Sequence, residues 1–126
     1  MADYYNKERL DYKIWKTILD ILKDENLVLK NSLMKIYQSS LNKDDLEQAE
    51  QLQSRLINMD AFLLGANNKV KLYLMKLNVV SPSHTGMRLQ SRRRHKKLQF
   101  EMDELKYAFL SLKADVEQFK QFIQSN

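Results

Sequence analysis

Cysteine is absent from this sequence, proline occurs once and glycine twice. Without cysteine, a disulfide framework, a thiolate zinc site and a cysteine nucleophile are excluded. Because glycine and proline interrupt helices, their scarcity favours long uninterrupted helices. With 126 residues, 44% of them hydrophobic and 29% charged, the chain is expected to form one domain, residues 1–126, with its own core.

Long apolar runs are missing as well. No segment approaches the roughly eighteen consecutive apolar residues that a membrane-spanning helix needs, so we expect no membrane association. The first residues, MADYYNKERLDYK, are interrupted by charges and contain no apolar segment of the kind found in a signal peptide. We therefore expect a cytoplasmic protein.

Three stretches carry apolar or amphipathic residues at alternating spacings of three and four, the periodicity of a helix with one packed face. We call them the core stripes. The central stripe is Ala49, Leu52, Leu56, Met59, Leu63, Ala66, Val70, Tyr73 and Leu77. The first stripe is Tyr12, Trp15, Leu19, Leu22, Asn26, Leu29, Leu33 and Ile36. The last stripe is Leu98, Met102, Leu105, Phe109, Leu112, Val116, Phe119 and Ile123.

The link between the first two stripes is short. Asn42 can cap the second helix, and Asp44 and Asp45 in its first turn suit the positive end of the helix dipole. A short link makes the first two helices antiparallel neighbours. Within the second helix, the polar and glycine residues from Gly65 to Asn68 lower helix propensity, so a bend is expected there.

The second link contains Pro82 and Gly86, which favour a loop. We expect this loop to continue through the basic residues, over 80–97. The predicted fold class is therefore all-α, with three long antiparallel helices in an up-down-up, coiled-coil-like bundle. The expected helices are about 7–40, 43–79 and 91–124.

Apolar residues also occur outside the core stripes. A second stripe beside the first, Ile14, Ile18, Ile21 and Val28, predicts a wide face buried between two partner helices. Others lie off the main stripes of the second and third helices: Ile57, Phe62, Leu64, Leu72, Phe100, Tyr107 and Leu110. A three-helix core cannot cover all of these. They favour a homo-oligomer such as a dimer, or another protein partner, although wide core faces and isolated exposed residues are an alternative explanation.

Asn26 is the one polar residue of the first core stripe. If the helices are antiparallel, Glu25 and Asn26 lie level with Asp60. A carboxylate-bridged metal site would need further acids and histidines at that level, and His84 and His95 are far from it. We therefore interpret Glu25, Asn26 and Asp60 as a polar layer that fixes the register between helices.

The two histidines lack the partners of a catalytic site. Neither His84 nor His95 has a nucleophile or a carboxylate cluster at a usable spacing, and we expect both at the surface. The two glycines form no phosphate-binding loop. We therefore expect no catalytic, cofactor-binding or metal site, and no enzymatic activity.

The net charge of +5 comes from one segment, because residues 81–97 contain cations and no acid. The cations are Arg88, Arg92, Arg93, Arg94, Lys96 and Lys97. Such a cluster can bind phosphates of nucleic acid or an acidic protein surface, which gives a second hypothesis: a nucleic-acid or ribosome-associated binding protein acting through 88–97. The alternative is a solvated helix end, because interleaved aromatic residues are lacking.

Several short segments resemble a group of small bacterial proteins built from three long helices. They are Trp15 followed by Glu25-Asn26 and Leu29-Lys30, the run Ala49-Glu50-Gln51-Leu52-Gln53, and His95-Lys96-Lys97-Leu98 leading into Glu101-Met102. The resemblance implies the same three-helix fold and a bacterial origin. It brings no active site or ligand. The first hypothesis for function is therefore a non-enzymatic interaction or scaffold protein that self-associates through an apolar helix face.

Overall fold

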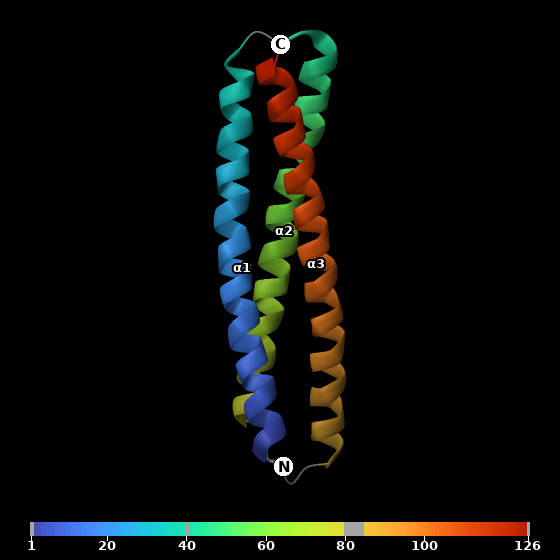
Figure 1. The fold of residues 1–126 in the computed structure, drawn as a ribbon. Coiled ribbons are helices and arrows are strands. Elements are labelled where there is room, and N and C mark those ends of the chain that lie inside the picture. The colour runs from blue at the N-terminus through green and yellow to red at the C-terminus, as the bar shows by residue number, and fades with distance from the viewer. Residues whose placement is uncertain (1, 40, 80–84, 126) are drawn as a thin grey trace.

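A computed structural model describes residues 2–39, 41–79 and 85–125, with the side chains of 6–39, 41–77 and 89–125 (Figure 1). The chain forms three helices: α1 (Ala2–Tyr37), α2 (Lys43–Val79) and α3 (Thr85–Ser125). Each helix packs against the other two, with α1 and α3 parallel and α2 antiparallel to both. In the view of Figure 1, α2 passes behind the other two helices. The predicted all-α, up-down-up bundle is confirmed.

The three core stripes form the core. Most of their members are buried, and Ala66, Tyr73, Leu105 and Ile123 are partly buried against the others. The largest fully buried side chains include Tyr12, Leu33, Leu56 and Phe109. Because a stripe of this width faces two neighbouring helices in a three-helix bundle, burial of the stripes is the main apolar contribution to stability.

The first link has the predicted cap. The Asn42 side-chain oxygen accepts a hydrogen bond from the Asp45 backbone N–H at 2.8 Å, and the Asn42 carbonyl accepts from the Leu46 N–H at 2.9 Å. On the other side of the link, α1 ends at Tyr37, about three residues earlier than predicted. There the Ser39 backbone N–H donates to the Ile36 carbonyl at 3.0 Å, which satisfies one of the free carbonyls of the helix end.

Two helix starts differ from the predicted ones. Helix α1 begins at Ala2, and α3 begins at Thr85, so the expected loop over 80–97 is wrong from residue 85 onward. Residues 80–84 lie outside the described residues. Residues 91–97 are helix and not loop because Ser91 and His95 continue the last core stripe toward the N-terminus of α3, and both are buried against α1.

Ion pairs join the flanks of the core stripes. They are Lys30–Asp60 between α1 and α2, Arg55–Asp115 and Lys69–Glu101 between α2 and α3, and Glu25–Lys113 between α1 and α3. Arg55 and Asp115 approach to 2.8 Å, and Lys69 and Glu101 to 3.0 Å. Exposed pairs of this kind contribute at most about 1 kcal/mol each. Their arrangement nevertheless favours the observed order of helices over one with like charges at the flanks.

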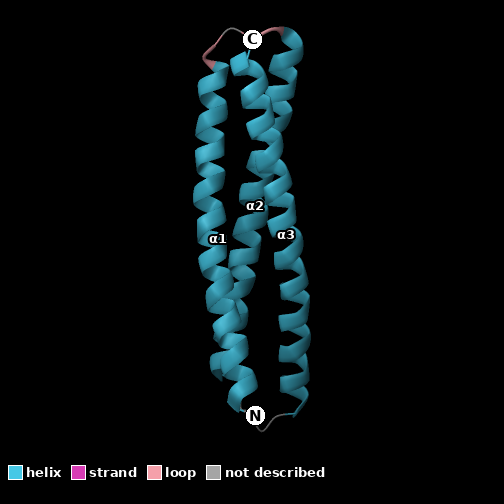
Figure 2. Cartoon of the chain, in the orientation of Figure 1, coloured by secondary structure: helices cyan, strands magenta, loops and turns pink. Residues whose placement is uncertain are grey.

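The second apolar stripe of α1 is not buried as predicted. Ile18 packs partly against the core, whereas Ile14, Ile21 and Val28 are exposed. The reason is that α3 contacts α1 along the flank of Asp11 and Glu25, so the positions one step further round the helix face outward. Figure 2 shows that the described part of the chain is almost entirely helix. None of the described helices is long and apolar enough to cross a membrane.

Candidate functional site

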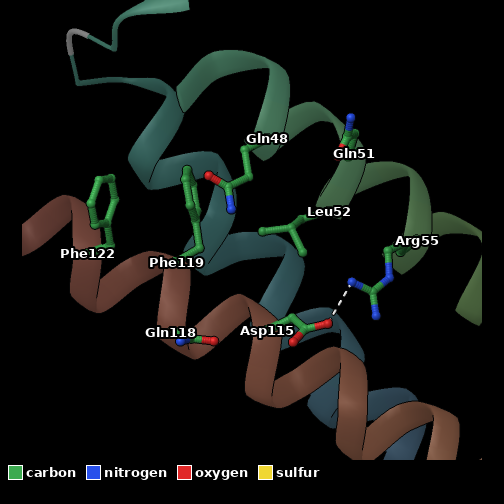
Figure 3. A pocket seen from close by; sticks show the side chains of 8 residues that line it. All are labelled: Gln48, Gln51, Leu52, Arg55, Asp115, Gln118, Phe119 and Phe122. Carbon is green, nitrogen blue, oxygen red and sulfur yellow. Dashed lines mark hydrogen bonds and ion pairs between the residues drawn. The ribbon is translucent and has the colours of Figure 1, made fainter. Parts of the chain in front are cut away.

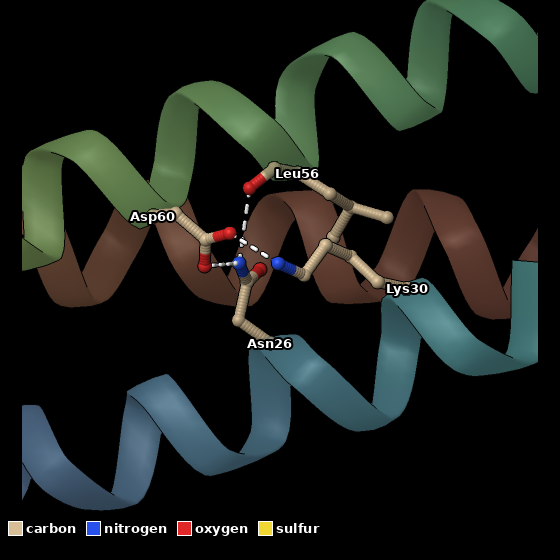
Figure 4. A network of polar contacts seen from close by, with 4 residues as sticks. All are labelled: Asn26, Lys30, Leu56 and Asp60. Atoms are coloured by element: carbon tan, nitrogen blue, oxygen red, sulfur yellow. Dashed lines mark hydrogen bonds and ion pairs between the residues drawn. The ribbon is translucent and has the colours of Figure 1, made fainter.

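The polar layer lies between α1 and α2 (Figure 4). The Asn26 side-chain amide is fully buried and donates to the Leu56 carbonyl at 3.0 Å and to Asp60 Oδ1 at 2.7 Å. Lys30, one turn further along α1, donates to the other oxygen of Asp60. The Asp60 carboxylate therefore receives one donor on each oxygen, and both come from α1.

Charge in this layer is set by Lys30 and Asp60. Burial alone would raise the pKa of Asp60. Hydrogen bonds from Lys30 and Asn26, together with the positive charges of Lys30 and Lys23, outweigh it and hold the pKa of Asp60 below its ordinary value of 3.8. The layer consequently contains a carboxylate neutralised by an ammonium group.

Glu25 is not part of this layer. It lies on the flank of α1 that faces α3, where its carboxylate is 3.6 Å from the Lys113 ammonium. The amide oxygen of Asn26 is buried and has no hydrogen-bond partner within the described structure. The layer therefore consists of Asn26, Lys30 and Asp60. The prediction omits Lys30 because it compared only acidic and amide side chains at the same height in the two antiparallel helices. That the layer sets the register remains a prediction.

A second polar group is buried between the N-terminal parts of α1 and α3, after the first turn of each helix. His95 Nε2 lies 2.8 Å from Asp11 Oδ2, and the imidazole stacks on the Trp15 ring with centroids 5.2 Å apart at an angle of 25°. Tyr12 meets the imidazole edge-on, with centroids 5.7 Å apart. His95 is only 8% exposed. The expectation that His95 lies at the surface is wrong, and His84 lies outside the described residues.

Glu8 completes this group. Its side chain is fully buried, and Oε1 accepts hydrogen bonds from the Tyr12 hydroxyl at 2.9 Å and the Ser91 hydroxyl at 2.7 Å. Glu8 Oε2 has no hydrogen-bond partner within the described structure. We call Glu8, Asp11, Tyr12, Trp15, Ser91 and His95 the terminal cluster.

The sequence contains a signal for the terminal cluster. Ser91 and His95 precede Leu98 and Met102 at the spacings of the last core stripe, and Glu8 precedes Tyr12 by four residues. If both stripes are continued toward the N-terminus of each helix and polar residues are allowed, Glu8, Ser91 and His95 fall in the interface between α1 and α3. A histidine beside a carboxylate is a geometry used in proton transfer, but here Trp15 and Tyr12 cover the imidazole. The described contacts join α1 to α3.

The basic segment, residues 88–97, lies on α3. The packing of that helix decides which of its side chains are buried and which are exposed. Ser91 and His95 point inward, and Arg94 lies toward α2, with its guanidinium 5.6 Å from the centre of the Tyr73 ring. The remaining cations are exposed: Arg92, Arg93, Lys96 and Lys97. We call these four the basic face. The side chain of Arg88, in the first turn of α3, lies outside the described side chains.

The start of α3 decides how the helix dipole acts on these cations. Because α3 starts at Thr85, the basic face begins after the first turn of the helix, and the effect of the helix dipole falls off within that turn. Mutual repulsion among the four exposed charges remains.

A groove of about 450 Å³ opens between α2 and α3 near the C-terminus of α3 (Figure 3). Leu52 and Phe119 form its floor, and Gln48 and Gln118 lie at its sides. The ion pair between Arg55 and Asp115 borders one end of it. The side chains contain no nucleophile or unpaired acid. Among the described residues, no group of three or more histidine, aspartate or glutamate side chains could hold a metal ion.

No protein-family model, curated protein or solved structure matches this chain. The similarity to small bacterial three-helix proteins therefore stays an interpretation of the sequence.

Proposed function

We propose that this chain is a non-enzymatic interaction or scaffold protein that self-associates through an apolar outer helix face. The observation that carries the proposal is the exposure of large apolar side chains along the helices. Every residue predicted to lie outside the core is exposed: Ile57, Phe62, Leu64, Leu72, Phe100, Tyr107 and Leu110. Ile14, Ile21 and Val28 of α1 add to them.

The size and number of these side chains support an interface. Single exposed apolar residues are normal on a monomer and need no explanation. Here aromatic side chains such as Phe62, Phe100 and Tyr107 are each more than 60% exposed, and each large aromatic ring left in water forgoes a substantial burial contribution. Repeated exposure on all three helices is typical of a protein that covers part of its surface with a partner.

The oligomeric state tests this proposal directly. Sedimentation equilibrium across the micromolar range is expected to give a dimer that dissociates on dilution. The same measurement after replacing Val28, Leu64 and Tyr107 one at a time by serine tests one exposed residue of each helix, since only changes inside the interface weaken association. A strict monomer at the highest concentration would reject self-association.

A second candidate is nucleic-acid binding through the basic face. Its supporting observation is that Arg92 and Lys96, and likewise Arg93 and Lys97, are four residues apart on a helix. They lie one turn from each other, with β-carbons about 6 Å apart. These two pairs lie side by side on the exposed surface of α3. Phosphate contacts of this kind would bind DNA or RNA without sequence preference.

Salt dependence tests this second candidate. Binding to single-stranded RNA or duplex DNA at low salt should weaken steeply as salt rises. Replacing Arg93, Lys96 and Lys97 together by glutamine should abolish binding. The matched control replaces Lys23, Lys35 and Lys43, which are also exposed, and should retain it. No binding to either nucleic acid at low salt ends this candidate.

A further inference from the structure

The outer side of α2 carries four residues spaced seven apart: Glu50, Ile57, Leu64 and Lys71. All are exposed, Ile57 to 55% and Leu64 to 61%. A seven-residue spacing nearly returns to the same side of a helix. These side chains therefore form one line along α2, which we call the α2 outer row.

The order of residues in the α2 outer row is acidic, apolar, apolar, basic. Glu50 and Lys71 are equally far from the point midway between Asp60 and Ala61, and so are Ile57 and Leu64. If a second α2 lies antiparallel across this point, each Glu50 is level with a Lys71 and each Ile57 is level with a Leu64. A parallel arrangement would instead place like charges together.

The same polarity extends over the whole of α2. Residues 43–60 contain two basic and five acidic side chains, whereas residues 61–79 contain three basic side chains and no acid. An antiparallel second copy therefore brings the acidic half of one α2 to the basic half of the other, at both ends of the contact. Complementary fields of this kind favour one orientation of a pair over the other.

The centre of the α2 outer row also leaves space. Ala61, next to the midpoint, is exposed and has only a methyl group, so two helices can approach closely there. Beside Leu64, a groove of about 330 Å³ opens between α2 and α1, with Leu27 on its α1 side. In the antiparallel arrangement this groove is level with Ile57 of the second copy, which gives that side chain an apolar recess.

The outer rows of the other helices lack this complementarity. On α1, the row is Lys7, Ile14, Ile21, Val28 and Lys35, so self-pairing in either direction sets lysine against lysine. On α3, antiparallel pairing of a row centred on Tyr107 with a second copy places Arg93 level with Gln121. Arg93 then has no acidic partner. Of the rows compared, only that on α2 pairs opposite charges with a second copy.

We propose that two copies of this chain dimerise through antiparallel α2 outer rows, about a two-fold axis near Ala61. This proposal specifies the partner and the geometry of the self-association proposed above and rests on it. Within the described part of one chain, Glu50 and Lys71 take part in no ion pair. Both charges are therefore left for the second copy.

Charge reversal tests the pairing. Glu50→Lys turns both Glu50–Lys71 contacts of the dimer into repulsive ones, and the dimer dissociation constant is expected to rise about tenfold. Adding Lys71→Glu restores opposite charges and should bring affinity back to within about threefold of the original. Glu117→Lys on α3 changes the net charge equally and should leave affinity unaltered. If the double variant binds no better than Glu50→Lys, the antiparallel pairing is wrong.

Cross-linking tests the position of the axis. Because the chain has no cysteine, single-cysteine variants can be joined by a bismaleimide that spans about 10 Å, the separation of packed helices. Ala61→Cys should give a covalent dimer, whereas Val28→Cys and Tyr107→Cys should not. A dimer linked at position 28 or 107 instead of 61 overturns the α2 interface but leaves self-association standing. A protein that is monomeric at every concentration overturns both proposals.

Discussion

His95 on α3 and Asp11 on α1 form a 2.8 Å contact between Nε2 and Oδ2 that ties two parallel helices together beneath the basic face. The imidazole also stacks on Trp15, the only tryptophan of the chain. His95 stands within a run of cations in the sequence, but its side chain belongs to the packing between α1 and α3. The neighbouring cations are exposed because Ser91, His95 and the last core stripe occupy the inward side of α3.

Removal of the imidazole should destabilise the bundle. His95→Ala leaves the Asp11 carboxylate without this partner and uncovers one face of Trp15, so the free energy of unfolding should fall by about 2 kcal/mol. Urea unfolding followed by the fluorescence of Trp15 measures this change in stability, and the Trp15 ring is in direct contact with His95. The exposed neighbour provides the control: Lys97→Ala should change stability by less than about 0.5 kcal/mol. Equal, small effects of both substitutions would mean that residues 85–97 do not pack as described.

The hydroxyl of Ser91 should contribute through Glu8. Ser91→Ala removes one of the two donors to a fully buried carboxylate oxygen, which is expected to cost about 1 kcal/mol despite the better helix propensity of alanine. Ser111→Ala, at an exposed position of the same helix, should be neutral or slightly stabilising. In a double-mutant cycle with Glu8→Gln, additive effects would contradict a direct Ser91–Glu8 interaction.

The three core stripes could be predicted because burial in a bundle leaves a three-four spacing that survives in the sequence. The inward polar residues could not be predicted in the same way. Ser91 and His95 occupy core positions, but a rule that counts only apolar residues begins the core stripe at Leu98 and leaves both outside the core. Their burial depends on Glu8 and Asp11, more than eighty residues away in the sequence.

The surroundings of residues beside the core stripes were predicted less well than the burial of the stripes themselves. Antiparallel pairing correctly brought Asn26 level with Asp60, because a tight turn fixes that alignment. The sequence does not state on which flank of α1 the third helix packs. The prediction that Glu25 faces Asp60 is therefore wrong, because Glu25 faces Lys113. The prediction that Ile14 and Ile21 are buried is wrong for the same reason, since both are exposed.

Asn26→Leu tests whether the polar layer selects one register. Leucine fills the same position in the core stripe and Asp60 keeps Lys30, so the free energy of unfolding should stay the same or rise by about 1 kcal/mol. Slipped pairings and mixed oligomers should then appear. They would be detected as additional amide cross-peaks by NMR and as several species in sedimentation. A single destabilised species would instead identify Asn26 as a hydrogen-bonding residue without a role in register.

Asp60 predicts how stability depends on pH. The carboxyl has a lower pKa in the folded chain than its ordinary value of 3.8, so its contribution is complete above that value and is lost as the pH falls through the folded pKa. Urea unfolding between about pH 2 and pH 6 should show a loss on the acid side that is smaller in Asp60→Asn. Asp24→Asn, at an exposed position of α1, is the control and should keep the full acid dependence. If Asp60→Asn and the original chain lose stability in parallel, the Lys30–Asp60 pair contributes nothing.

Replacement of Gly65 by alanine is expected to stabilise the protein. Gly65 lies inside α2, is exposed, and has open space around the position of a β-carbon, with nothing within 4 Å. Because glycine loses more backbone entropy in a helix than alanine does, Gly65→Ala should raise the free energy of unfolding by about 1 kcal/mol. The reverse change at an exposed alanine, Ala114→Gly on α3, should lower it by a similar amount. Circular dichroism during thermal unfolding at one protein concentration measures both, since dilution also shifts the midpoint of a dimer. If Gly65→Ala destabilises the protein instead, the glycine is needed for a close contact on the outer side of α2, and cross-linking of Ala61→Cys in the same background would then show whether that contact is with a second copy.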